Sequence, residues 1–164
     1  MPELQRLRAD HAPAVLAFEL ANRAYFTDFV SDRGDKFFDH FDESYNELLA
    51  EQEAGTSIFH VLIGEDDTVL GLFNLRDVED DTAVLGYRVA QHVAGHGVAT
   101  ATVEELCLVA VQRYGLRTLR AAANLDNVAS QKVLTKAGFA PEGPADPAVI
   151  GGRPGIWYQR HLAV

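Results

Sequence analysis

The segment Gln91–Thr100 carries the clearest candidate chemistry in this 164-residue sequence. Two glycines, Gly95 and Gly97, flank His96 between an apolar, strand-like run and a long amphipathic helical pattern. Glycine permits a positive φ or a close approach of the backbone to a ligand. The start of a helix adds unpaired N–H groups and the positive end of a dipole. Together these features favour binding of an anion, most often a pyrophosphate.

Two common phosphate loops do not fit this segment. It lacks the Gly-Lys-Ser/Thr ending of a Walker loop, and Thr100 stands where a dinucleotide fingerprint needs Gly or Ala. The acid expected about twenty residues later is also missing, since residues 120–124 contain none. On these residues alone, the segment is equally compatible with a Gly-rich turn that joins a strand to a helix.

A second segment, Asn124–Phe139, has the pattern of a strand end, a capped helix and a glycine stop. Asp126 or Asn127 can cap the helix start, and Gly138 suits the position after its end. The apolar positions keep the helical spacing that burial requires: Val133, Leu134 and Ala137.

The two segments in this order resemble the GNAT superfamily of N-acetyltransferases, and more closely its ribosomal-protein alanine N-acetyltransferase branch (RimJ/RimL-like). That branch carries Arg/Gln-x-x-Gly-x-Gly/Ala before a long helix, then Asn-x-x-Asn-x-x-Ser and Lys-x-Gly-Phe. The second block is matched in full by Asn124, Asn127, Ser130 and Lys136–Phe139. The first block is matched at the two glycines but departs at His92, where Arg or Gln is usual, and at His96, where Arg is common.

The resemblance implies an α/β (α+β) GNAT fold over residues 1–164, as a single domain. Its mixed, mostly antiparallel sheet of about seven strands is flanked by about four helices, in the order β-α-α-β-β-β-α-β-α-β-β. In that fold the coenzyme inserts between two central strands that splay apart. The expected strands are Leu4–Arg8, Ser57–Ile63, Val69–Val78, Thr82–Ala90, Leu116–Ala123, Phe139–Glu142 and Ile156–Leu162. The expected helices are Ala12–Tyr25, Ser44–Ala54, Val98–Tyr114 and Asn127–Ala137.

Several local features sharpen this outline. Acidic turns of hairpin length separate the second, third and fourth strands, which predicts an antiparallel meander. Asp10 is expected to cap the first helix. The segment Phe26–Phe41 is expected to be a partly helical flap, and Gly143–Gly155 a loop.

Acetyl-CoA is the donor that the resemblance implies. Its pyrophosphate would contact the residues from Gly95 to Thr100, and its pantetheine arm would pair with the strand edge at Arg88, Val89 and Ala90. The implied coenzyme-binding residues are Arg88, Val89, Ala90, Gly95, His96, Gly97, Val98, Ala99, Thr100, Asn124, Asn127, Ser130 and Lys132. Lys136 is a further candidate for the adenosine phosphates.

The implied reaction is acyl transfer from a thioester to a neutral amine. At pH 7, deprotonation costs about 1.4 kcal/mol for an α-amine and about 4.6 kcal/mol for a lysine, so an α-amine needs little help. Asn74, Asp77 and Tyr87 are candidates to relay its proton through water. The resemblance implies that Ser130 protonates the leaving sulfur, because no Tyr occurs between Ala123 and Phe139 to do so.

The acceptor is left open by the residues themselves. The resemblance favours a protein or peptide N-terminal α-amine, with a small-molecule amine (antibiotic, polyamine or amino acid) as the alternative. A non-catalytic GNAT-fold module that binds CoA or a partner is the other alternative. The residues expected to shape the acceptor pocket are Asn22, Tyr25, Phe26, Phe29 and Asp77, together with the loop Gly143–Gly155.

Composition excludes several other classes. A net charge of −10 opposes nucleic-acid binding, which needs a basic surface. The sequence contains no run of 18 apolar residues, so no membrane span is expected. The N-terminus lacks the apolar h-region of a secretory signal. The single Cys107 fits a reducing cytoplasm.

The histidines are scattered, and His92 and His96 lack further ligands at metal-binding spacing, so no metal is expected. Monomer and homodimer both stay open.

Overall fold

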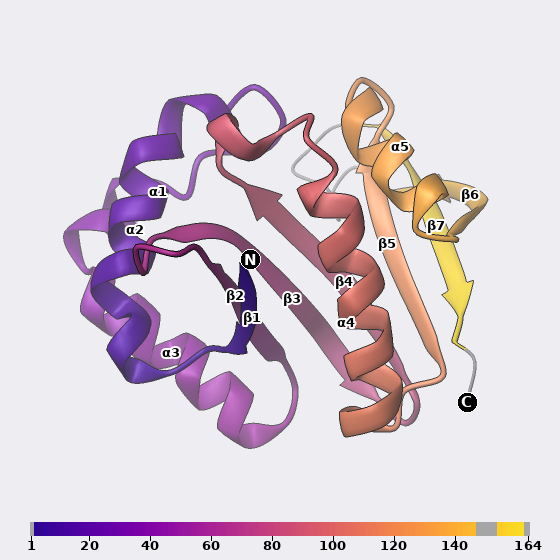
Figure 1. The fold of residues 1–164 in the computed structure, drawn as a ribbon, viewed down its shortest axis with the longest axis horizontal. Coiled ribbons are helices and arrows are strands. Elements are labelled where there is room, and N and C mark those ends of the chain that lie inside the picture. The colour runs from indigo at the N-terminus through magenta and orange to yellow at the C-terminus, as the bar shows by residue number, and fades with distance from the viewer. Residues whose placement is uncertain (1, 147–153, 163–164) are drawn as a thin grey trace.

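The computed structural model describes residues 2–146 and 154–162. A seven-stranded sheet forms its centre, with the strands ordered β1-β2-β3-β4-β5-β7-β6 (Figure 1). The strands are β1 (Glu3–Arg6), β2 (Ile58–Ile63), β3 (Val69–Glu79), β4 (Thr82–Val89), β5 (Thr118–Asn124), β6 (Ala140–Ala145) and β7 (Gly155–His161). Neighbours are antiparallel except for β4 and β5, which are parallel. The expected mixed, mostly antiparallel sheet and the β2–β4 meander are therefore confirmed.

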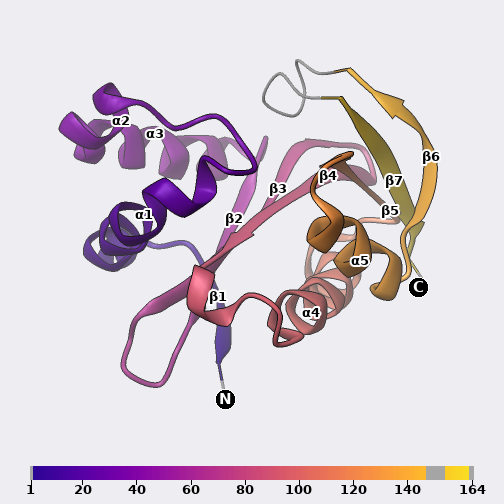
Figure 2. The ribbon, with the colours of Figure 1, turned by 90° about the horizontal axis from the view of Figure 1, so that it is seen from above.

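Helices cover both faces of the sheet. They are α1 (Ala12–Phe26), α2 (Asp35–Asp39), α3 (Phe41–Ala54), α4 (Val98–Tyr114) and α5 (Val128–Lys136). Figure 2 shows α1, α2 and α3 on one face and α4 and α5 on the other. The short helix α2 is an addition to the expected order, and it lies in the segment for which a partly helical flap is predicted.

Side chains that alternate along the central strands pack into two separate apolar clusters, one on each face of the sheet. Phe73 and Leu75 of β3 are fully buried on the α4 face, where Leu106 of α4 lies in the same apolar cluster. Leu72, one position away, belongs to the cluster on the α1 face with Phe18. Strand β2 is buried at every position, and because side chains alternate between faces, the sheet must be covered there on both sides.

Strands β4 and β5 are paired at one end only. Their contact is limited to Thr82–Val84 of β4 opposite Thr118–Arg120 of β5. Beyond it, β4 stays with β3 as far as Val89, whereas β5 stays with β7 as far as Asn124. The two strands therefore diverge, which is the splay that the resemblance implies.

Several expected element ends need correction. Asp10 does not cap α1: a 3-10 turn precedes that helix, His11 is its N-cap, and Asp10 instead pairs with Arg8. Of the two expected caps of α5, the structure uses Asn127, whose side chain accepts a hydrogen bond from the Ser130 N–H at 3.1 Å. The helix expected from Ser44 begins three residues earlier, at Phe41.

The expected loop Gly143–Gly155 is wrong at both ends that the structure describes. Strand β6 runs on to Ala145, because residues 143–145 pair with β7, and β7 begins at Gly155 itself. Residues 147–153 of this expected loop lie outside the described residues.

A buried histidine links β2 to α4. His60 is 3% exposed, and its Nε2 lies 2.9 Å from the Tyr114 hydroxyl. Burial disfavours the charged imidazolium and lowers the pKa of His60 to about 4. The folded state therefore favours a neutral ring at this position.

We expect His60 to make stability fall as the pH drops from about 6.5 to about 4. The unfolded chain protonates first, at an ordinary pKa of about 6.5, so the folded state loses about 3 kcal/mol over this window. Urea unfolding at a series of pH values measures the effect. His60→Gln is the control, because it keeps a polar group there without a titratable ring. If both proteins show the same slope between pH 6.5 and 4, His60 is not its source.

Candidate active site

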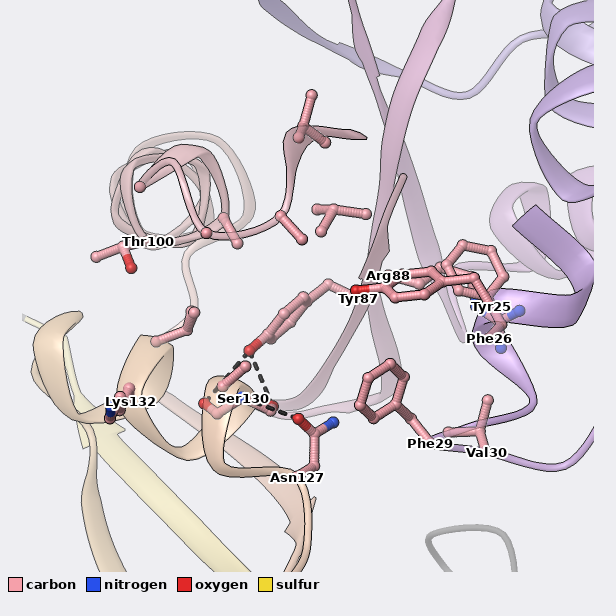
Figure 3. Close-up of a pocket in the computed structure, with 18 of the residues that line it drawn as sticks. Tyr25, Phe26, Phe29, Val30, Tyr87, Arg88, Thr100, Asn127, Ser130 and Lys132 are labelled. Carbon is pink, nitrogen blue, oxygen red and sulfur yellow. Dashed lines mark hydrogen bonds between the residues drawn. The ribbon is translucent and has the colours of Figure 1, made fainter. Parts of the chain in front are cut away.

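A cavity of about 320 Å³ lies where β4 and β5 part. Figure 3 shows that its wall is assembled from distant parts of the chain: α1 and the turn after it, β4, the start of α4, and α5. The parting of the two strands brings these segments to one place. The cavity is therefore a direct consequence of the sheet topology.

The glycine segment ends at the cavity with free backbone donors. Gly95 and Gly97 have φ values of 80° and 77°, a conformation that other residues rarely adopt. Gly97 is the N-cap of α4 and has no side chain to accept the first N–H groups of the helix. Helical bonding begins with Ala101, whose N–H donates to the Gly97 carbonyl at 3.1 Å. The preceding N–H groups and the helix dipole therefore suit an anion.

The space beside these glycines is open. A Cβ atom on Gly95 or Gly97 would meet no heavy atom within 4 Å. Lys132 and Lys136 of α5 also line the cavity. Open space, unpaired N–H groups and two ammonium groups fit the phosphates of a CoA-type coenzyme.

Strand β4 offers an open edge at Val89. The Ala90 N–H donates to the Leu70 carbonyl at 2.9 Å, toward β3. Because peptide groups alternate in direction along a strand, those of Val89 point the other way, into the splay. Val89 lines the cavity. Its peptide can pair with an extended amide chain or donate to a developing oxyanion.

Two hydroxyl groups meet in the middle of the cavity. The Ser130 Oγ lies 3.0 Å from the Tyr87 Oη, and Figure 3 shows the two side chains pointing toward each other from α5 and β4. The Asn127 cap holds the backbone N–H of Ser130, which fixes the first turn of α5. Tyr87 is stacked on Phe73 with ring centroids 5.6 Å apart.

The environment of Tyr87 makes it a proton-bearing group. Burial raises the pKa of Tyr87 to about 12, although the hydrogen bond with Ser130 acts in the opposite direction. At neutral pH the phenol therefore keeps its proton. The pair can pass that proton along the Tyr87–Ser130 hydrogen bond, and Tyr87 is poorly suited to act as a base.

The structure brings most of the predicted site residues to this cavity. Those that line it are Tyr25, Phe26, Phe29, Tyr87, Arg88, Val89, Gly95, Gly97, Ala99, Thr100, Asn127, Ser130 and Lys132. Those that lie elsewhere are Asn22, Asn74, Asp77, Ala90, His96, Val98 and Asn124. Of the latter, His96 is exposed and Val98 opens helix α4.

Two expected proton relays lie away from the hydroxyl pair. Asn74 is next to Phe73 on β3 and so points to the other face of the sheet, where it borders a small hollow under α2 and α3. Asp77 is exposed near the β3–β4 hairpin with a φ of 50°. Neither contributes to the cavity wall.

Two of the expected ligand-binding residues form hydrogen bonds within the fold. Asn22 is buried, donates to the Phe18 carbonyl at 2.9 Å and accepts from the Gln91 N–H at 3.0 Å. Asn124, also buried, donates to the Phe29 carbonyl. Both asparagines hold segments that shape the cavity.

Further lining residues were missed by the sequence reasoning: Val30, Val93, Ala94, Ala129 and Val133. They are small or apolar, and no pattern separates them from core residues. Glu19, which lies behind Arg88, was missed although a signal existed. It falls on the same helical face as Val15 and Asn22, and a carboxylate is unusual on a face that is buried.

Comparison with known proteins identifies the family. A family model described as "Acetyltransferase (GNAT) domain" matches residues 3–140. The N-acetyltransferase p20 of Bacillus licheniformis is 30% identical over 100 residues, which are 60% of this chain and 55% of p20. The chain thus spans about half the length of this curated relative.

Solved structures share the whole fold. A ribosomal-protein-S5-alanine acetyltransferase from Vibrio fischeri has a TM-score of 0.89 at 18% identity, covering 98% of this chain and 93% of its own. A spermidine N-acetyltransferase from Vibrio cholerae, in complex with CoA and spermine, has a TM-score of 0.80 at 17% identity, covering 98% and 95%. Because the family model spans most of the sequence and the splayed sheet agrees with it, this chain belongs to the GNAT acetyltransferase family.

Proposed function

We propose that this protein is an N-acetyltransferase that moves an acetyl group from acetyl-CoA to a primary amine. The observation that carries the proposal is the single cavity in which the anion-binding start of α4, the free edge of β4 and the Tyr87–Ser130 hydroxyl pair meet. The coenzyme phosphates, the oxyanion and the leaving thiolate need these three features in turn.

The residues that would hold the coenzyme follow from their chemistry. The N–H groups at the start of α4, with Lys132 and Lys136, suit the phosphates. The peptide groups of Val89 suit the amides of the pantetheine arm. When bound, acetyl-CoA supplies the activated acyl group.

The strand edge and the hydroxyl pair suit two different steps of the reaction, stabilisation of the oxyanion and protonation of the sulfur. The Val89 N–H suits the oxygen that gains negative charge during attack. Ser130, hydrogen-bonded to a Tyr87 that keeps its proton, suits protonation of the departing sulfur. The attacking amine must be neutral, and an α-amine reaches that state at little cost at pH 7.

The proposed acceptor is the N-terminal α-amine of a protein or peptide, as in the RimJ/RimL-like branch. The similar fold named for ribosomal protein S5 favours this acceptor, and the one solved with spermine makes a small-molecule amine the second candidate. No helix in the described ranges is long and apolar enough to cross a membrane. A cytoplasmic location fits the free thiol of Cys107.

We expect Gly97→Val to weaken CoA binding by at least tenfold. The branched side chain would occupy the open space that suits a phosphate, and it would strain a residue with φ of 77°. Gly115→Val is a matched control, because Gly115 ends the same helix with φ of 65° and equally open surroundings. Strain should cost each variant about 1–2 kcal/mol of stability.

Isothermal calorimetry with CoA separates the two variants. Weak CoA binding by Gly97→Val alone supports the cradle, whereas equal binding by both variants contradicts it. ATP and NADH are the specificity controls, and stabilisation by either of them without stabilisation by CoA would rule out the proposed coenzyme.

We expect Ser130→Ala to lower kcat about 10- to 1,000-fold with little change in acetyl-CoA affinity. General acid catalysis contributes about 10²–10⁴, and a thiolate leaves readily enough to need less of it. Thr135→Ala is the control, since Thr135 lies on the same helix and bonds the Gln131 carbonyl away from the cavity. Single-turnover rates at saturating acetyl-CoA give the chemical step.

Tyr87→Phe tests whether the two hydroxyls act together. If they form one proton path, the double variant should lose little more than the stronger single variant. Additive losses would mean independent roles. Collapse of coenzyme affinity in Ser130→Ala with an intact single-turnover rate would make Ser130 a binding residue.

A further inference from the structure

A buried carboxylate behind the cavity is shared by two arginines. Glu19 of α1 is 2% exposed and forms ion pairs with Arg33 and Arg88. The Arg88 Nη1 lies 3.3 Å from the Glu19 Oε1, and its guanidinium lies over the Phe26 ring at 4.7 Å. One carboxylate and two guanidinium groups leave one positive charge in excess.

The excess charge faces the cavity through Arg88. Arg88 lines the cavity, whereas Glu19 and Arg33 do not. In Figure 3, Arg88 lies beside Tyr25 and Phe26, on the side away from Thr100. Burial and the neighbouring Arg33 lower the pKa of Arg88 to about 10, so the guanidinium is still charged at neutral pH. A guanidinium has five N–H donors, and the Glu19 bond uses one of those on Arg88.

No acidic side chain offsets this charge along the described wall. The titratable groups that line the cavity are Tyr25, Tyr87, Arg88, Lys132 and Lys136. A second ammonium on the acceptor would therefore meet a desolvated guanidinium and no carboxylate. An acceptor with a carboxylate or a carbonyl near its amine would instead meet a cationic group that can donate hydrogen bonds.

We propose that Arg88 is a specificity-determining residue that selects amines joined to a neutral or anionic group and discriminates against polycations. The inference rests on the proposed acetyltransferase activity and narrows its acceptor. It favours a peptide α-amine, whose nearest polar neighbour is a carbonyl, over a polyamine.

The net charge of −10 does not cancel this preference. Distant surface carboxylates attract cations in general, but salt screens them beyond about 8–10 Å. A half-buried guanidinium beside the amine acts at short range and in a lower dielectric. The local charge therefore decides which bound acceptors react.

The test is a matched set of three dipeptide amides, Ala-Glu, Ala-Gln and Ala-Lys, with spermidine as a polycation. For the wild-type enzyme we expect kcat/KM to fall in the order Glu, Gln, Lys, with about a tenfold span. Arg88→Gln should compress the span to less than about threefold, while Arg88→Lys should retain most of it. In Arg88→Gln, Glu19 keeps Arg33 as its partner, and a thermal melt verifies folding.

Arg120→Gln is the control for a general loss of positive charge. Arg120 pairs with Glu142 and lies over the Trp157 ring, outside the cavity wall. This variant should keep the wild-type order and span. An equal loss of selectivity in Arg120→Gln would overturn a local role for Arg88.

Product binding tests the same inference without turnover. Calorimetry with the CoA-loaded protein should show tighter binding of N-acetyl-Ala-Glu-amide than of N-acetyl-Ala-Lys-amide, and Arg88→Gln should remove the difference. Absence of acetyl transfer to every amine would refute the proposed activity, whereas the binding order would still decide the role of Arg88. Equal treatment of the Glu and Lys ligands by the wild type, or an unchanged preference in Arg88→Gln, would refute the selectivity.

Discussion

The parting of β4 and β5 is the constraint on which the other features of the site depend. On one edge β5 pairs with β7 along its whole length, whereas on the other edge it makes only a short parallel contact with β4. The missing part of the ladder exposes the peptide groups of Val89, which a closed sheet would have consumed. It also leaves Tyr87 and Ser130 free to meet across the gap from opposite sides.

The end of the cavity lined by α1 and the turn after it is tied to both parted strands. Glu19 and Arg33 anchor α1 and the segment after it to Arg88 of β4. On the other side, Asn124 at the end of β5 holds the Phe29 carbonyl. Removing one partner from a buried ion pair typically costs several kcal/mol, so this frame resists rearrangement. Aromatic contacts among Tyr25, Phe26 and Phe29 complete the wall.

Much of the fold could be predicted because its signals are local. Helix α4 begins and ends where its periodicity and glycines predict, and the β2–β4 meander follows from alternation and acidic turns. The predictions that were wrong failed because another interaction was available. Asp10 pairs with Arg8 instead of capping α1, and β6 extends because it can pair with β7. The resemblance supplied the splay, which alternation and periodicity do not encode.

The site was predictable residue by residue where a motif existed, and less so where side-chain direction mattered. Asn74 and Tyr87 both lie on central strands, yet they point to opposite faces because of strand parity and register. The Tyr87–Ser130 pair joins residues 43 positions apart, and no spacing rule brings them together. The sequence alone could have marked Glu19 as unusual, because it is an acid on an apolar helix face. Its two arginine partners could be identified only from the structure.

Both ends of the cavity are cationic, for different reasons. At one end, the start of α4 and two lysines suit phosphates. At the other end, the single negative charge of Glu19 is shared by Arg33 and Arg88, so one positive charge remains. An ammonium gains nothing from such walls, whereas a neutral amine loses nothing. The cavity therefore favours the deprotonated nucleophile without a carboxylate base along its described wall, and this advantage suffices only for weakly basic amines. A lysine-like amine must give up about 3 kcal/mol more than an α-amine to reach the same state at pH 7, so a wall whose described residues include no carboxylate discriminates by basicity as well as by charge.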